Sequence, residues 1–218
     1  MQIPLVGYWD RLPDRKLVLG AYAGKECFYK TGLLNVLYHL KPINCLEIGT
    51  HYGGTSLVFN RYFECEQSNG NLLTTDLKLY LKLAMPRIHQ VVVYPHSLDV
   101  INRHWVTPAD LLTGYESRVG DSVNANCTIL GECMKTLDIA EFDFAFIDGD
   151  HTRDSALKDI AIARKLTKPP HHLLLDDTKE AVHEVSVLYK NELSAQYSHY
   201  DFEDWPVFIG MSLIWDNR

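Results

Sequence analysis

Residues Cys45–Ser56 read CLEIGTHYGGTS, and this stretch passes from an apolar run into a glycine-rich turn. A short apolar run without alternation is typical of a strand that is buried on both faces of a parallel sheet. The residues after the glycines are compatible with a helix, whose first N–H groups would face a ligand beyond the end of the strand. We therefore predict a strand, a ligand-binding turn and a helix in this order.

Other apolar runs predict further strands. The strand candidates are Ile43–Ile48, Leu72–Thr75, Cys127–Leu130, Phe142–Ile147, Leu173–Leu175, and a terminal pair at Gln196–Asp201 and Met211–Trp215. Apolar residues at helical spacing predict a helix over Glu26–Leu40 and another after Asp177. Strands that alternate with helices form a mostly parallel sheet covered by helices, so the sequence predicts an α/β fold.

The composition limits the class of partner. The chain has 218 residues, 46% hydrophobic and 22% charged, with a net charge of −7. Proteins that bind nucleic acid cluster Lys and Arg to displace counterions, so we expect no nucleic-acid partner. No apolar run approaches the roughly 20 residues that span a bilayer, so we expect no membrane partner. Five cysteines without a C-x-x-C pair predict a reducing, cytoplasmic location.

The sequence shows no repeat, linker or low-complexity tract, which predicts one domain over residues 1–218. About fifty residues separate Leu77 from Asn126, which is more than a connecting helix requires. We predict an insertion at about residues 77–126 that forms a lid, a wall of the substrate pocket or a dimer contact. A homodimer through this insertion or through the terminal strands is compatible with the sequence.

The spacing of the glycines narrows the ligand. A dinucleotide-binding turn needs G-x-G-x-x-G, but His51 stands where its second glycine would be. A phosphate-binding loop needs a lysine near its end, and Thr55 occupies that position. The pattern that remains is Glu-x-Gly-x-x-x-Gly, formed by Glu47, Gly49 and Gly53.

This pattern resembles the Rossmann-like S-adenosylmethionine (SAM)-dependent methyltransferases, in which it cradles the amino-acid part of the cofactor. The resemblance implies a doubly wound, mostly parallel sheet of about seven strands, the last of them antiparallel. It also implies that Asp76, at the end of the next strand, binds the ribose hydroxyls. Carboxylates near a sulfonium favour its positive charge, which fits such a cofactor.

Two segments compete for the position that faces adenine in this family, where the pattern is Gly-Asp-Ser. Glu132 follows Gly131 close to the next predicted strand, and we assign the contact to it. Gly120-Asp121-Ser122 matches the pattern literally but lies farther from that strand.

The stretch FDFAFIDGDH at residues 142–151, followed by HLLLDD at residues 172–177, is similar to the catechol-type and sugar O-methyltransferases. The resemblance implies that Asp148 borders the cofactor and that Asp148, Asp176 and Asp177 converge at neighbouring strand ends. Three carboxylates form an oxygen-rich site suited to Mg²⁺. The alternative is a site without metal, in which Asp176 caps a helix.

In catechol-type enzymes a lysine three residues after the first metal-binding aspartate is the general base, and His151 stands at that position here. Histidine accepts protons near neutral pH, and Asp150 is a competing candidate. We predict SAM-dependent methylation of a small-molecule acceptor at a hydroxyl oxygen, with His151 and Asp148 as catalytic residues. The alternatives are an inactive module that binds cofactor or a partner, and a hydroxylase-like relative on the same fold.

Overall fold

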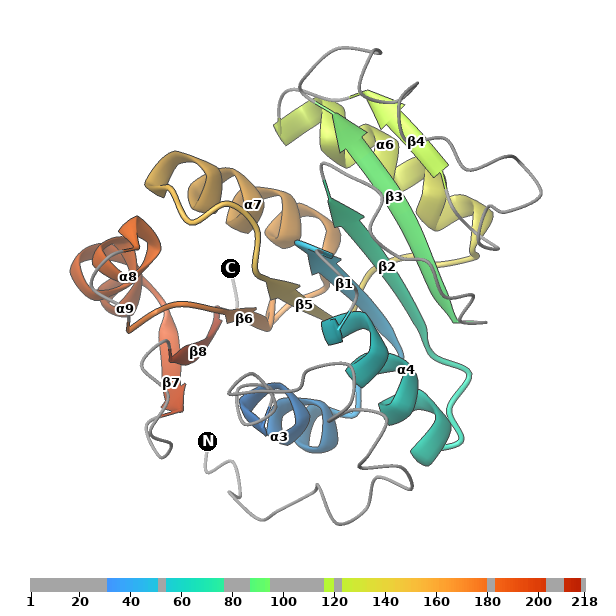
Figure 1. Cartoon of the computed structure of the whole chain (residues 1–218), viewed down its shortest axis with the longest axis horizontal. Helices are drawn as coiled ribbons and strands as arrows, with labels where there is room; N and C mark the ends of the chain where they lie inside the picture. Colours follow the sequence, from blue (N-terminus) through green and yellow to red (C-terminus); the bar gives the residue numbers. More distant parts are fainter. Residues whose placement is uncertain are drawn as a thin grey trace.

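The computed structural model describes residues 31–50, 54–76, 87–94, 116–119, 123–179, 183–202 and 210–216. An eight-stranded sheet forms the centre, in the order β4-β3-β2-β1-β5-β6-β8-β7 (Figure 1). The strands are β1 (Asn44–Ile48), β2 (Asn71–Asp76), β3 (Ile88–Tyr94), β4 (Glu116–Val119), β5 (Phe144–Ile147), β6 (Leu173–Leu175), β7 (Ser198–Phe202) and β8 (Met211–Trp215). All neighbouring pairs from β4 to β6 are parallel, whereas β8 runs antiparallel to both β6 and β7.

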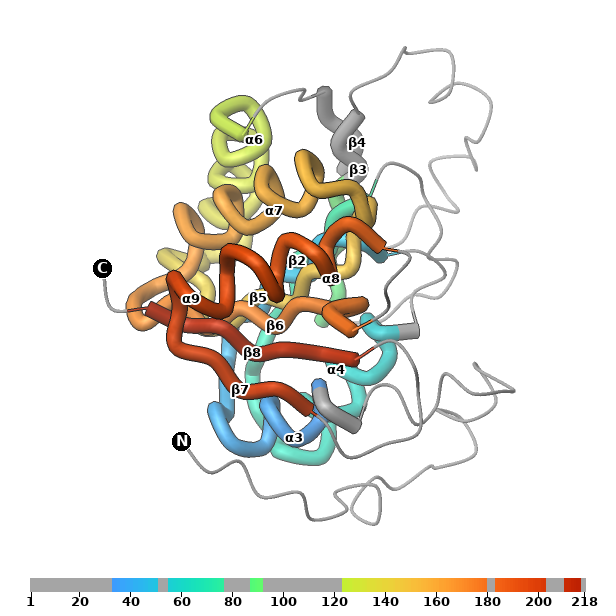
Figure 2. Tube along the Cα trace, turned by 90° about the vertical axis from the view of Figure 1, so that its left-hand side faces the viewer, coloured from blue at the N-terminus to red at the C-terminus, as the bar shows by residue number. Residues whose placement is uncertain are grey.

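Helices cover both faces of the sheet. They are α3 (Thr31–Leu40), α4 (Gly54–Cys65), α6 (Val123–Thr136), α7 (Arg153–Leu166), α8 (Glu184–Leu188), the π-helix η3 (Tyr189–Leu193) and α9 (Ser194–Gln196). Figure 2 shows α6 and α7 on one side of the strands, and α3 and α4 on the other. The predicted doubly wound α/β class is therefore confirmed. Among the described residues, none of the helices combines the length and the hydrophobicity of a membrane-spanning segment.

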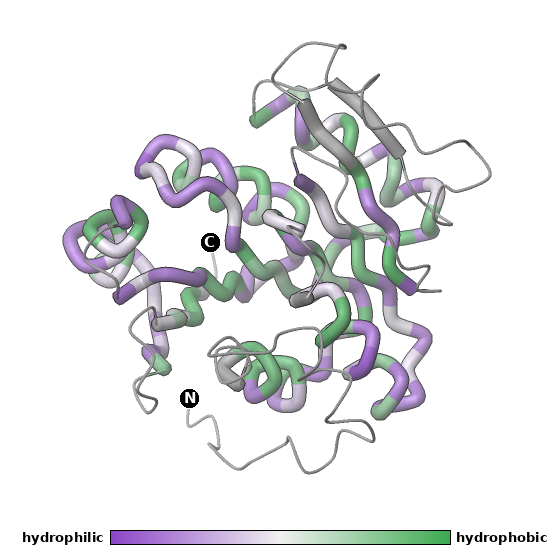
Figure 3. The backbone as a smooth tube through the Cα atoms, in the orientation of Figure 1, coloured by the Kyte–Doolittle hydropathy of each residue, from purple (hydrophilic) through white to green (hydrophobic). Residues whose placement is uncertain are grey.

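The two faces of the sheet have separate cores. Leu46 and Ile48 of β1 pack with residues of α6, α7 and α8, whereas Cys45 packs with residues of α3 and α4. This division follows from the strand geometry, because successive side chains point to opposite faces. Both faces are covered, so the strands are apolar on both, and Figure 3 shows hydrophobic colour along the central strands β5 and β6.

The register aligns the carboxyl ends of four strands. Ile48 of β1 pairs with Thr75 of β2 and with Ile147 of β5, and Ile147 pairs in turn with Leu175 of β6. Along the chain, β2, β3 and β4 are added in turn on one side of β1. The next strand, β5, lies on the other side of β1. Ligands of open parallel sheets bind at such a reversal, beyond the carboxyl ends of the strands.

One predicted strand is wrong. Residues Cys127–Leu130 lie inside α6, where Leu130, Cys133 and Met134 are buried. These positions recur every three or four residues, which is helical spacing. The four residues Cys127–Leu130 resembled a strand only when taken alone. Residues 77–126, for which the sequence predicted an insertion, include β3, β4 and the first residues of α6.

Asp143 fastens the start of β1 to the start of β5. Its Oδ2 accepts hydrogen bonds from the backbone N–H groups of Ile43 and Asn44, both at 2.8 Å, and its Oδ1 pairs with Lys168. Burial alone would raise the pKa of Asp143, but these hydrogen bonds lower it. The ionised form is therefore favoured in the folded chain.

We expect Asp143→Asn to lower the free energy of unfolding by about 1–2 kcal/mol at pH 7. Because the folded-state pKa is depressed, this stabilisation is present above the unfolded pKa near 4 and is lost as pH falls through the folded value. Urea denaturation at pH 7 and pH 3 measures the difference. Glu141→Gln, an equal charge change at an exposed neighbour, is the control. An equal loss of unfolding free energy in Asp143→Asn at pH 7 and at pH 3 would contradict this prediction.

Candidate active site

At Gly49 the turn after β1 packs closely against the turn after β5. Its φ is +101°, and a Cβ added to it would lie 1.8 Å from the carbonyl oxygen of Asp148. The Gly49 N–H donates to the Thr75 carbonyl and the Asp148 N–H donates to the Ile48 carbonyl, both at 2.8 Å. Only glycine fits this position, because a side chain would meet both a forbidden φ and the backbone of Asp148.

The other acids of the predicted cofactor site lie in or at the ends of strands. Glu47 is fully buried in β1 and accepts a hydrogen bond from Ser56 Oγ of α4 at 2.5 Å. Asp76 is the last residue of β2, and it follows Thr75, which pairs with Ile48. Asp76, Gly49 and Asp148 therefore leave three adjacent strands at the same level. Gly53 lies outside the described residues.

The structure contradicts the reasoning that selected Glu132. This residue is exposed in the middle of α6 and does not follow a strand. Glu132 was preferred for its closeness to the next predicted strand, but the helix α6 fills the interval between β4 and β5. In sequence, Gly120–Ser122 is the segment between β4 and α6, and it lies outside the described residues.

His151 lies between two carboxylates. Its Nδ1 is 3.0 Å from Asp177 Oδ2, and its Nε2 is 3.6 Å from Asp148 Oδ1. The contacts with the carboxylates of Asp148 and then Asp177 raise the pKa of His151 to about 10, although burial opposes them. At neutral pH the ring is therefore protonated, and a general base would first have to lose that proton.

Asp150, the competing base, is engaged in the turn before α7. Its Oδ2 accepts hydrogen bonds from the hydroxyls of Thr152 and Ser155, each at 2.9 Å. Burial alone would raise the pKa of Asp150, but these bonds lower it. The local contacts indicate that Asp150 shapes the start of α7.

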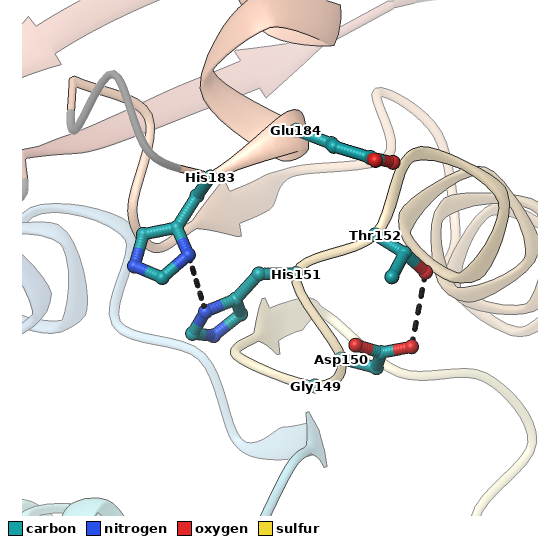
Figure 4. Close-up of a pocket in the computed structure, with 6 residues that line it drawn as sticks. All are labelled: Gly149, Asp150, His151, Thr152, His183 and Glu184. Atoms are coloured by element: carbon teal, nitrogen blue, oxygen red, sulfur yellow. Dashed lines mark hydrogen bonds between the residues drawn. The ribbon is translucent and has the colours of Figure 1, made fainter.

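His183 completes the site, and the sequence reasoning missed it. It lies just before α8, and its Nδ1 is 3.2 Å from His151 Nδ1 (Figure 4). An open pocket of about 430 Å³ borders this pair, and its lining residues are Gly149, Asp150, His151, Thr152, His183 and Glu184. No motif marks a histidine six residues after an aspartate pair, so only the fold reveals this contact.

The three aspartates do not form the oxygen-rich site that was predicted. Asp148 and Asp177 lie on opposite edges of the His151 ring, which separates them. Asp176 is buried, and its Oδ1 accepts a hydrogen bond from the Asp177 N–H at 3.1 Å. Within the described ranges, the group that could hold a metal is His151, Asp177 and His183. Two imidazoles and one carboxylate do not fit Mg²⁺, which prefers oxygen ligands.

Asp159 of α7 packs against the turn after β5. A Cβ added to Gly149 would lie 2.6 Å from Asp159 Oδ2, so the carboxyl group packs directly against this glycine. Burial, and then the charge of Asp150, raise the pKa of Asp159 to about 7. The neutral carboxyl is therefore favoured in the folded chain.

We expect Asp159→Asn to raise the free energy of unfolding by about 1–2 kcal/mol at pH 8. The raised pKa means that wild-type stability is fully present below the unfolded pKa near 4 and falls as pH rises through 7. Part of the Asp159 surface reaches solvent, so the gain is smaller than the pKa shift alone implies. Urea denaturation of the wild type and Asp159→Asn at pH 8 and pH 5 tests this prediction. A gain in unfolding free energy that is as large at pH 5 as at pH 8 would contradict it.

Comparison with known proteins identifies the family. A family model described as a methyltransferase domain matches residues 46–178, more than half of the chain. The chain belongs to this methyltransferase family. The matched segment runs from β1 to just after β6, so it includes every strand end that borders the site. No curated protein sequence matches the chain.

Solved structures support the fold of this methyltransferase. A proposed O-methyltransferase from Klebsiella pneumoniae is 18% identical, with a TM-score of 0.52 over 99% of this chain and 92% of that one. The O-methyltransferase of Bacillus cereus, solved in complex with S-adenosylhomocysteine, is 17% identical. Its TM-score is 0.51, and the match covers 95% of this chain and 91% of that one. A proposed ribosomal RNA methyltransferase from Plasmodium falciparum is 13% identical, with a TM-score of 0.56 over 90% and 98%. At these identities the likeness concerns the fold and leaves the acceptor open.

Proposed function

We propose that this methyltransferase moves the methyl group of SAM to an oxygen of a small hydroxyl-bearing acceptor. The observation that carries the proposal is the register that aligns Gly49, Asp76 and Asp148 at the reversal point of the sheet. A cofactor that lies across these three strand ends can approach the backbone closely at Gly49. Asp76 is then available to its ribose, and Asp148 lies near its sulfonium.

The cofactor would extend from the end of β1 past the ends of β2 and β3 to the end of β4. Gly49 and Gly53 cradle its amino-acid part beside Glu47, and Asp76 accepts hydrogen bonds from its ribose hydroxyls. We assign the adenine contact to Asp121 in place of Glu132, because Asp121 follows β4 in sequence and Glu132 does not follow a strand. The B. cereus relative, solved with S-adenosylhomocysteine, supports a nucleoside ligand on this fold.

The acceptor would lie over Asp148 and the Nε2 edge of His151, beside the open pocket. Asp148 accepts the proton of the acceptor hydroxyl, and the His151 Nε2–H donates to the oxygen and lowers its pKa. The oxygen then attacks the methyl carbon in line with the sulfonium, so the C–O bond forms as the C–S bond breaks. The products are the methyl ether, S-adenosylhomocysteine and one proton.

A small acceptor fits the charge and the pocket better than RNA does. The P. falciparum relative is described as a ribosomal RNA methyltransferase. This chain carries a net charge of −7, which opposes binding to a phosphate backbone. The pocket of about 430 Å³ is the size of a site for a small molecule.

We expect Asp148→Asn to lower kcat by about 100-fold, because an amide cannot accept the hydroxyl proton. S-adenosylhomocysteine formation would be measured with catechols, sugars and phenols, and mass spectrometry would locate the added methyl group. Asp138→Asn, which removes an acid in the turn after α6, is the matched control. Transfer only to nitrogen or to RNA, or an unchanged kcat in Asp148→Asn, would contradict the proposal. SAM binding without turnover of any acceptor would favour an inactive module.

A further inference from the structure

The geometry points to a nitrogen-rich site for a divalent transition-metal ion, made by His151, Asp177 and His183. Each residue offers one donor atom, and these atoms lie within 4.8 Å of one another. His151 Nδ1 is 3.0 Å from Asp177 Oδ2 and 3.2 Å from His183 Nδ1. Metal–ligand bonds of about 2.0 Å place neighbouring donors about 3.3 Å apart on a tetrahedral ion, so these two spacings match.

The chemistry of the donors selects the class of metal. Two imidazole nitrogens and one carboxylate oxygen form the ligand set of Zn²⁺ and of Fe²⁺ in many proteins. Mg²⁺ takes oxygen ligands and gives up its water reluctantly, so it gains little from imidazole. This ligand set therefore differs from the Mg²⁺ site that the sequence predicted.

The two histidine ligands come from segments that are tied to each other. The Val185 N–H at the start of α8 donates to the His151 carbonyl at 3.2 Å, and the Arg153 N–H donates to Glu184 Oε2 at 2.8 Å. These bonds hold the turn before α7 against the start of α8. Asp177 has a φ of +57°, a left-handed conformation that aspartate tolerates in turns.

The surroundings of the cluster also suit a metal. Asp148 Oδ1 lies 3.6 Å from His151 Nε2, on the edge of the ring that faces away from Asp177. Histidines that bind metals commonly direct their second ring nitrogen toward a carboxylate, which fixes the ring orientation. The open pocket borders both histidines, so water could occupy the remaining positions of the ion (Figure 4).

This site goes beyond the proposed function and is compatible with it. The metal would use the Nδ1 edge of His151, whereas the proposed acceptor contact uses the Nε2 edge. Metal binding can therefore be measured without SAM or acceptor. Failure of the metal site would leave methyl transfer intact, and failure of methyl transfer would leave the metal site intact.

The test is calorimetric titration of Zn²⁺ into the full chain, first treated with EDTA and dialysed, in buffer with millimolar Mg²⁺. We expect one Zn²⁺ per chain, and Co²⁺ added in its place should give the visible absorption of a site with nitrogen ligands. His183→Gln and Asp177→Asn should each weaken Zn²⁺ binding at least tenfold. Circular dichroism would verify that both variants fold.

His199→Gln is the matched control, because it removes an exposed histidine of β7 that is not part of the cluster. Its Zn²⁺ affinity should equal that of the wild type. Three results would each overturn the inference: no stoichiometric Zn²⁺ binding, displacement of Zn²⁺ by Mg²⁺, or wild-type affinity in a folded His183→Gln variant.

Discussion

Gly49→Ala is expected to abolish measurable SAM binding and to lower the free energy of unfolding by about 3 kcal/mol or more. The alanine Cβ would lie 1.8 Å from the Asp148 carbonyl oxygen, at a φ of +101° that alanine rarely adopts. The turn after β1 would have to move away from the turn after β5, and the proposed cofactor contacts lie on both turns. Urea denaturation and SAM titration measure the two effects.

Gly131→Ala is the matched control for this substitution. Gly131 lies inside α6, and no neighbouring atom lies within 4 Å of the position that a Cβ would take, so alanine should stabilise the chain by about 0.5–1 kcal/mol. SAM affinity should be unchanged in this control. A Gly49→Ala variant with wild-type stability and wild-type SAM affinity would show that the two turns are not packed as described.

Asp76→Ala is expected to raise the Kd for SAM by about 30- to 100-fold without unfolding the chain. The proposed pair of hydrogen bonds from the ribose hydroxyls to a carboxylate contributes about 2–3 kcal/mol, which corresponds to this change in Kd. Calorimetry of both proteins at the same salt concentration measures the difference.

Glu132→Ala tests whether Glu132, which the sequence placed on the cofactor beside Asp76, contributes to SAM binding. Its carboxylate is exposed in the middle of α6, so its removal should leave SAM affinity within about twofold of wild type. If Glu132→Ala weakened binding as much as Asp76→Ala, the cofactor would have to lie over α6, contrary to the proposal.

The apolar runs predicted much of the fold because they encode buried strands. The bounds of β6 and β8 agree with the predicted runs Leu173–Leu175 and Met211–Trp215. The edge strand β4 reads ESRV, and it was missed because a polar edge strand lacks the apolar signal of a central one. Cys127–Leu130 was misassigned because a four-residue apolar run does not distinguish a strand from one turn of a helix.

The sequence could predict which strand ends carry acids, but not how the side chains meet. Asp148 and Asp177 follow adjacent parallel strands, as the motif implied. The insertion of the His151 ring between them depends on the path of the turn before α7, which no spacing rule describes. His183 joins the site only because α8 begins against that turn.

The most direct test of the central claim is calorimetric titration of SAM into the purified wild-type chain, once with Mg²⁺ and once with EDTA. The account predicts one SAM per chain in both conditions, because the proposed cofactor contacts involve no metal. If SAM does not bind in either condition, the aligned strand ends do not form a SAM site, and the account of this methyltransferase is contradicted.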